Sequence, residues 1–75
     1  MIKVYGKSNG CANCVVAKET LERHNIEYKF IDVMEDKGAL DFIKSMRYRQ
    51  VPIIENEGDF YTFKTLDDLL FSLGY

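Results

Sequence analysis

The chain has only two cysteines, Cys11 and Cys14, and only two residues separate them. They follow the apolar run Met1–Tyr5, whose alternation and β-branched residues are typical of a strand, and a polar turn with two glycines. A helical pattern begins at or just before Cys14. The sequence therefore predicts a Cys-x-x-Cys pair at a strand-to-helix junction, which is the placement of a dithiol redox centre.

This placement gives the two cysteines different chemistry. The first turn of a helix favours negative charge because its unpaired N–H groups point outward, so the pKa of Cys11 should fall below that of a free thiol. Cys14 lies about one helical turn further on, within reach of Cys11. We expect Cys11 to attack a target disulfide and Cys14 to displace the reduced target. Lys7 and Lys18 are near in sequence and could add positive potential.

A metal site is the alternative of another class. Zinc normally needs four ligands, and beyond the two cysteines the chain offers one histidine, His24, far along the first helix. A site shared in a dimer, or an iron–sulfur cluster completed by glutathione, would make the protein a metal- or cluster-binding module. His24 is otherwise explained as a residue that complements the helix macrodipole.

Length and charge limit the classes of protein. Seventy-five residues make one domain, residues 1–75, with no room for a second. The net charge of −2 with mixed signs gives no electrostatic footprint for nucleic acid or an anionic membrane. There is no signal-peptide pattern and no apolar stretch of membrane-spanning length. We therefore expect a cytoplasmic protein, and nothing requires more than a monomer.

Elements of different type alternate along the chain. The predicted order is a strand at 1–5, a helix at 14–24, a strand at 28–33, a second helix after Asp36, a strand at 51–55, a strand at 60–63 and a last helix from Thr65. This βαβαββα order predicts an α/β fold with a four-stranded mixed sheet flanked by helices.

The last helix carries its own signals. Thr65 and Asp68 have the spacing of a capping box, with Asp68 reaching back. We expect Gly74 to end the helix. The expected buried stripe consists of Leu66, Leu69, Leu70 and Leu73.

Pro52, the only proline, opens an apolar run. A strand's first residue tolerates proline. A cis Val51–Pro52 bond beside the cysteines is the alternative, but only about one X–Pro bond in twenty is cis, so these considerations alone favour trans.

The layout and the Cys11-Ala12-Asn13-Cys14 motif resemble the glutaredoxin branch of the thioredoxin fold over essentially the whole chain. In that family the proline after the second helix is cis and lies against the redox pair, which reverses the expectation for Pro52. The resemblance also implies that Val51 presents its backbone groups to an extended substrate segment.

Within this branch, residues 48–54 are similar to the aromatic-Arg-Gln-aliphatic-Pro segment of the NrdH-type redoxins. Residues 60–65 are more loosely similar to another NrdH segment, with Phe63 and Lys64 matching best. NrdH-redoxins take electrons from thioredoxin reductase, and so from NADPH, and pass them to ribonucleotide reductase. The resemblance implies partner-binding roles for Lys7, Arg49 and Gln50.

Ordinary glutaredoxins bind glutathione through Thr-Val-Pro and a Gly-Gly pair, where this chain has Gln50 and Lys64-Thr65. Asp67 does match the family's acidic residue that meets the glutathione amino group. The expected function is thus reduction of protein disulfides through a redox-active Cys11–Cys14 disulfide without a bound cofactor, with ribonucleotide reductase or another disulfide-bearing protein as target. A glutathione-dependent glutaredoxin is the alternative.

Overall fold

The computed structural model describes all residues, 1–75, and contains the predicted alternation of elements. Its elements are β1 (Ile2–Gly6), α1 (Ala12–Arg23), β2 (Tyr28–Asp32), α2 (Lys37–Ser45), β3 (Ile53–Asn56), β4 (Asp59–Thr62), the short 3₁₀ turn η1 (Phe63–Thr65) and α3 (Leu66–Ser72). The βαβαββα order is confirmed, with boundaries that differ from the predicted ones by one or two residues. None of the helices combines the length and hydropathy that a membrane crossing requires.

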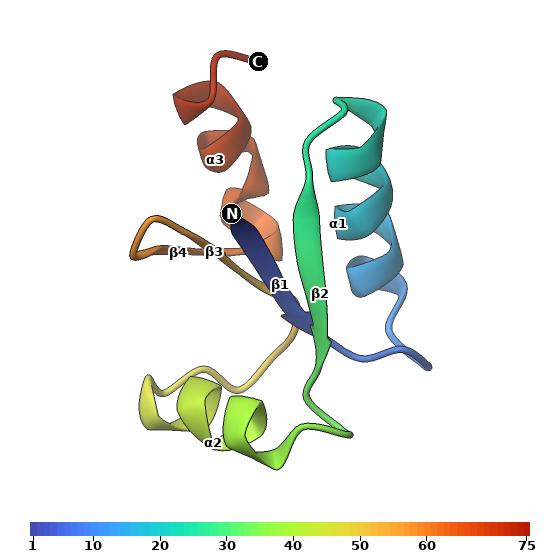
Figure 1. The fold of residues 1–75 in the computed structure, drawn as a ribbon, viewed down its shortest axis with the longest axis vertical. Coiled ribbons are helices and arrows are strands. Elements are labelled where there is room, and N and C mark those ends of the chain that lie inside the picture. The colour runs from blue at the N-terminus through green and yellow to red at the C-terminus, as the bar shows by residue number, and fades with distance from the viewer.

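The four strands form one mixed sheet in the order β2-β1-β3-β4. β1 pairs with β2 in parallel, because α1 carries the chain back across the sheet, and with β3 in antiparallel orientation. Figure 1 shows β1 and β2 side by side, with α2 below them and α1 and α3 in the upper half of the view. The loop between β1 and α1 leads to the cysteines.

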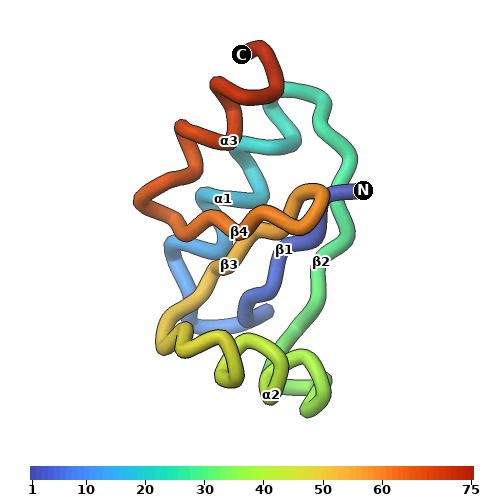
Figure 2. Tube along the Cα trace, turned by 90° about the vertical axis from the view of Figure 1, so that its left-hand side faces the viewer, coloured from blue at the N-terminus to red at the C-terminus, as the bar shows by residue number.

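The helices are divided between the two faces of the sheet. Alternation along the strands sends Ile2, Val4 and Ile54 into a core with residues of α1 and α3, and sends Tyr5 and Ile53 into a second core with Ile43 of α2. Figure 2 shows α2 set apart at one end of the molecule, away from α1 and α3. The alternation of period two in the strands thus produces a three-layer arrangement.

A tight hairpin joins β3 and β4. Asn56 pairs with Asp59, and the two residues between them, Glu57 and Gly58, both have a positive φ, of 51° and 85°. Two consecutive residues with positive φ define the type I′ turn that matches the twist of paired strands.

All three helices end with a residue in the left-handed region, namely Asn25, Arg47 and Gly74. In each, two hydrogen bonds close the last turn in the manner of a Schellman motif; after α2, the Tyr48 N–H donates to the Ile43 carbonyl at 3.1 Å and the Arg47 N–H to the Lys44 carbonyl at 2.9 Å. The predicted role of Gly74 is confirmed. Arg47, with a φ of 67°, is the least suited of the three residue types to this conformation.

We therefore expect Arg47→Gly to stabilise the protein. The left-handed conformation destabilises the folded protein by about 1–2 kcal/mol for a residue such as arginine, and glycine removes this cost. Glycine also has more freedom in the unfolded chain, which offsets about 0.5–1 kcal/mol of the gain, so the free energy of unfolding should rise by about 0.5–1 kcal/mol. Urea denaturation measures the change. Arg49→Gly is the matched control, because position 49 has no positive φ, and it should not gain stability. Equal effects at both positions would contradict this account of Arg47.

Two expectations for the last helix are wrong. The side chain of Thr65 does not cap α3; its Oγ1 instead accepts the Thr62 N–H at 2.8 Å, one turn earlier. Asp68 consequently has no capping box to complete, because the chain makes the η1 turn before α3 begins. Leu66, Leu69 and Leu70 are buried as predicted, but Leu73 is 38% exposed because the helix ends at Ser72.

Candidate active site at the cysteine pair

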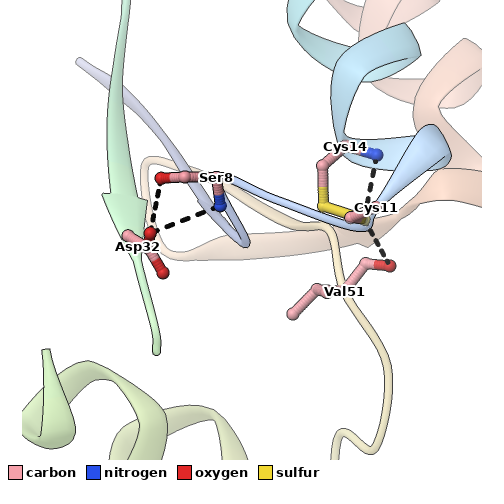
Figure 3. Close-up of a disulfide and its surroundings, with 5 residues drawn as sticks. All are labelled: Ser8, Cys11, Cys14, Asp32 and Val51. Carbon is pink, nitrogen blue, oxygen red and sulfur yellow. Dashed lines mark hydrogen bonds between the residues drawn. A yellow bond between two sulfur atoms is a disulfide. The ribbon is translucent and has the colours of Figure 1, made fainter. Parts of the chain in front are cut away.

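Cys11 is the N-cap residue of α1, and Cys14 lies in the first turn of that helix. The two sulfurs form a disulfide, and the Cys14 N–H donates to the Cys11 Sγ at 3.2 Å (Figure 3). No acidic side chain lies in the first turn of α1. In the reduced protein this helix terminus favours a thiolate on Cys11, because an N–H group already points at the sulfur and the helix dipole adds to it.

The two sulfurs differ in their access to solvent. Cys11 is half-buried, whereas Cys14 is fully buried beneath the first turn. Gly6, the last residue of β1, leaves room for the Cys14 sulfur: a Cβ at position 6 would lie 2.9 Å from the Cys14 Sγ and 3.1 Å from a ring carbon of Phe30. An incoming disulfide can therefore approach Cys11 more readily than Cys14.

The Val51–Pro52 peptide bond is cis, as the family resemblance implies. The expectation of a trans bond, which the frequency of cis X–Pro bonds alone favours, is therefore wrong. Pro52 is buried, and the carbonyl oxygen of Val51 lies 4.0 Å from the Cys11 Sγ (Figure 3). The segment before β3 is thus brought against the redox pair although it lies 40 residues away in the sequence.

Asp32, at the end of β2, holds the loop that carries the cysteines, and the sequence analysis missed it. The Ser8 hydroxyl and the Ser8 N–H both donate to the Asp32 carboxylate, the N–H at 3.3 Å (Figure 3). The Met34 N–H also donates to this carboxylate, at 2.8 Å. The Ser8 side-chain hydrogen bond, followed by that from the Met34 backbone, lowers the pKa of Asp32 below its ordinary value. An aspartate that ends a strand, two residues before the amide of a turn, was the available signal.

A hollow of about 330 Å³ opens beside Val51. It brings together three of the predicted partner-binding residues, Lys7, Arg49 and Gln50, although Lys7 comes from the loop after β1 and the others precede the cis bond. Lys18 is placed elsewhere, with its Nζ 4.2 Å from the centre of the Phe30 ring in a cation–π contact.

A smaller hollow, of about 70 Å³, shares Gln50 and Val51 with the first. Its lining residues are Asn13, Gln50, Val51, Pro52, Phe63 and Lys64. Asp67 is not among them; it is exposed in the first turn of α3. The structure therefore brings Gln50 and Lys64 together at this hollow and leaves Asp67 outside it.

No group of three or more His, Cys, Asp or Glu side chains lies close enough together to hold a metal ion. His24 is the C-cap residue of α1, as the macrodipole explanation predicts, and its ring lies 4.9 Å from that of Tyr75.

A buried cysteine and an accessible one, at a helix N-terminus on a four-stranded mixed sheet, define a thiol–disulfide oxidoreductase with a thioredoxin-like fold. The glutaredoxin family model matches residues 2–61. The chain belongs to the glutaredoxin family, whose members use a redox-active disulfide.

Relatives of known name agree with this assignment. The glutaredoxin-like protein NrdH of Lactococcus lactis subsp. cremoris (strain MG1363) is 31% identical over 72 residues, which are 96% of this chain and 85% of the relative. The thioredoxin-like protein BC3987 has a similar structure, with a TM-score of 0.81 and 25% identity over 95% of this chain and 97% of that one. The NrdH-redoxin from Escherichia coli shares the fold, with a TM-score of 0.80 and 18% identity over 91% and 92% of the two chains.

Proposed function

We propose that this protein is an NrdH-type electron carrier, which accepts two electrons from thioredoxin reductase and passes them to the disulfide of ribonucleotide reductase. The observation that carries the proposal is the similarity to NrdH over 96% of the chain. The protein works in this scheme as a single-domain monomer in the reducing cytoplasm, where its dithiol form can be maintained.

The proposed cycle assigns one step to each sulfur. The Cys11 thiolate attacks a sulfur of the target disulfide, so that a mixed disulfide forms and the first target thiolate leaves and takes up a proton. The Cys14 thiolate then attacks the Cys11 sulfur, which releases the second target thiolate and forms the Cys11–Cys14 disulfide. The target is reduced by two electrons and the protein is oxidised by two, which NADPH restores through thioredoxin reductase.

The residues around the cis bond support a protein partner. The Val51 carbonyl lies beside the Cys11 sulfur and is available to an extended segment of the target. Gln50 and Lys64 stand where the glutathione-binding glutaredoxins have threonine and glycine, and a lysine side chain fills space that glycine leaves open. We assign Arg49, Gln50 and Lys7 to partner binding because they line the hollow beside Val51 and the resemblance to NrdH-type redoxins implies this role.

Glutathione is the second candidate donor, because Asp67 matches the acidic residue that meets the glutathione amino group in this family. Its carboxylate is exposed in the first turn of α3 and so is accessible to a ligand.

The two donors are distinguished by measuring NADPH consumption with the oxidised protein as the electron acceptor. One arm contains thioredoxin reductase, and the other contains glutathione with glutathione reductase. With thioredoxin reductase we expect the protein disulfide to be reduced, with one NADPH consumed per molecule of protein, and in the second arm only the NADPH consumption seen without the protein. Reduction of the protein confined to the glutathione arm would contradict the NrdH-type route and identify a glutathione-dependent glutaredoxin.

A further inference from the structure

A second hollow adjoins the one beside Val51. Lys44, Tyr48 and Arg49 line both, and Arg47 lines only the second, which has a volume of about 590 Å³. We call the two together the cationic hollow, because their charged lining residues are Lys7, Lys44, Arg47 and Arg49.

The charge of this surface is opposite to that of the whole protein. The chain has ten Lys and Arg against twelve Asp and Glu, a net charge of −2, yet four of the ten cations and none of the twelve acids line the cationic hollow. The helix dipole accounts for cations at the end of α2, such as Lys44. It does not account for Lys7 and Arg49, which two other segments bring to the same place.

The cationic hollow also has an apolar floor. Val33, Leu40 and Ile43 line it and are what we call its floor, since Val33 and Ile43 are buried. Met34, 65% exposed, lines it as well. Four positive charges around an apolar depression match a ligand that presents an apolar side chain between carboxylates.

The cationic hollow lies close to Cys11, so a segment of the target protein can reach it. Val51 lines the hollow, and its carbonyl oxygen lies 4.0 Å from the Cys11 Sγ. A chain whose disulfide is attacked by Cys11 therefore comes close to Val51, and from there residues next to its cysteine can reach the cationic hollow. A residue one or two positions away in an extended strand is about 3–7 Å distant, so these residues are close neighbours of the target cysteine.

We propose that the cationic hollow is the docking site for an acidic segment of the disulfide-bearing partner, which places one apolar side chain on the floor and its carboxylates against Lys7, Lys44 and Arg49. This inference rests on the proposed function, since it names the chemistry of the target that the dithiol reduces. The charges act before the chemical step by steering the encounter, and the apolar side chain holds the target disulfide at Cys11.

Reduction of two synthetic peptides tests the proposal. Both contain the same intramolecular disulfide and a neighbouring leucine, but one has aspartates and the other lysines around it. The protein is reduced with dithiothreitol and freed of it, so the assay does not depend on the natural electron donor. In low salt we expect the acidic peptide to be reduced at least about tenfold faster, and the difference to shrink in 0.5 M NaCl, where charges are screened beyond about 4 Å.

Two variants with the same change in net charge locate the effect. Lys44→Gln/Arg49→Gln should lose most of the preference for the acidic peptide, whereas Lys3→Gln/Arg23→Gln, whose side chains lie outside the hollow, should keep it. Hydroxyethyl disulfide, which is small and uncharged, reports on the sulfur chemistry alone. Lys3→Gln/Arg23→Gln should reduce it at the rate of the parent, and in Lys44→Gln/Arg49→Gln the rate with the acidic peptide should fall by a larger factor than the rate with hydroxyethyl disulfide.

Several results would overturn the proposal. Equal rates for the two peptides would do so, and so would a preference for the acidic peptide that survives Lys44→Gln/Arg49→Gln. Glutathione disulfide is measured as a further substrate, and a loss of rate confined to it in that variant would assign the hollow to glutathione. Failure to reduce even hydroxyethyl disulfide would remove the dithiol function itself. A preference for the acidic peptide together with no turnover by thioredoxin reductase would leave the docking site standing and contradict only the electron route.

Discussion

Replacement of Cys11 by serine is expected to abolish disulfide reduction, down to the rate measured without the protein. A serine hydroxyl at the helix N-terminus is not ionised at neutral pH and cannot form the mixed disulfide, while the buried Cys14 has no access to the target. Insulin reduction with dithiothreitol as electron source measures the loss.

Cys14→Ser is the matched control, and its expected result differs in kind. Cys11 can still attack, but no thiol remains to release the target, so the protein should accumulate as a mixed disulfide of higher mass in non-reducing electrophoresis. Cys11→Ser should give no such species. Equal activity of the two variants, or a mixed disulfide formed by Cys11→Ser, would contradict the assignment of Cys11 as the nucleophile.

Gly6→Ala is expected to destabilise the protein strongly, although Gly6 takes no part in the chemistry. The added methyl group would lie 2.9 Å from the Cys14 sulfur and 3.1 Å from Phe30, and both neighbours belong to the packed structure around the redox pair. Since overpacking of this kind costs about 1–3 kcal/mol, the free energy of unfolding should fall by that amount. Urea denaturation of the oxidised protein measures it, and the rate of disulfide reduction should fall as well because the Cys14 sulfur is displaced.

Gly38→Ala is the control for this prediction. Position 38 lies in α2, and a Cβ there meets only the Asp36 carboxylate at 3.4 Å, an ordinary contact. Alanine is favoured over glycine in a helix by about 0.5–1 kcal/mol, so this variant should be as stable as the parent or more stable. A Gly6→Ala protein as stable as Gly38→Ala would show that the space beside Cys14 is not required.

The order of elements and the redox pair could be predicted because both depend on local patterns. Alternation in residues 1–5 and 28–33 and the leucine spacing after Thr65 each reflect one face of one element, and the Cys-x-x-Cys spacing is itself local. Even here the details depend on the rest of the chain. Leu73 has the right spacing for the core but lies beyond the last residue of α3, so it remains partly exposed.

The rest of the site depends on contacts between distant segments. The cis bond at Pro52 could not be obtained from the local sequence, because the trans form is intrinsically preferred, and only the family resemblance indicated it. The Asp32 bonds to Ser8 span 24 residues, and the assembly of Lys7 with Arg49 requires the β1 loop to meet the segment before β3. Thr65 does not cap α3 because its Oγ1 already accepts the backbone N–H of Thr62, three residues earlier.

The most direct test of the proposed function is ribonucleotide reduction in a reconstituted system. It contains NADPH, thioredoxin reductase, this protein and a ribonucleotide reductase from the same source, and deoxyribonucleotide is measured over time. We predict that product formation beyond a single turnover depends on this protein and stops when Cys14→Ser replaces it. Sustained product formation without the protein, or none with it while thioredoxin reductase still reduces it, would contradict the assignment of ribonucleotide reductase as its target.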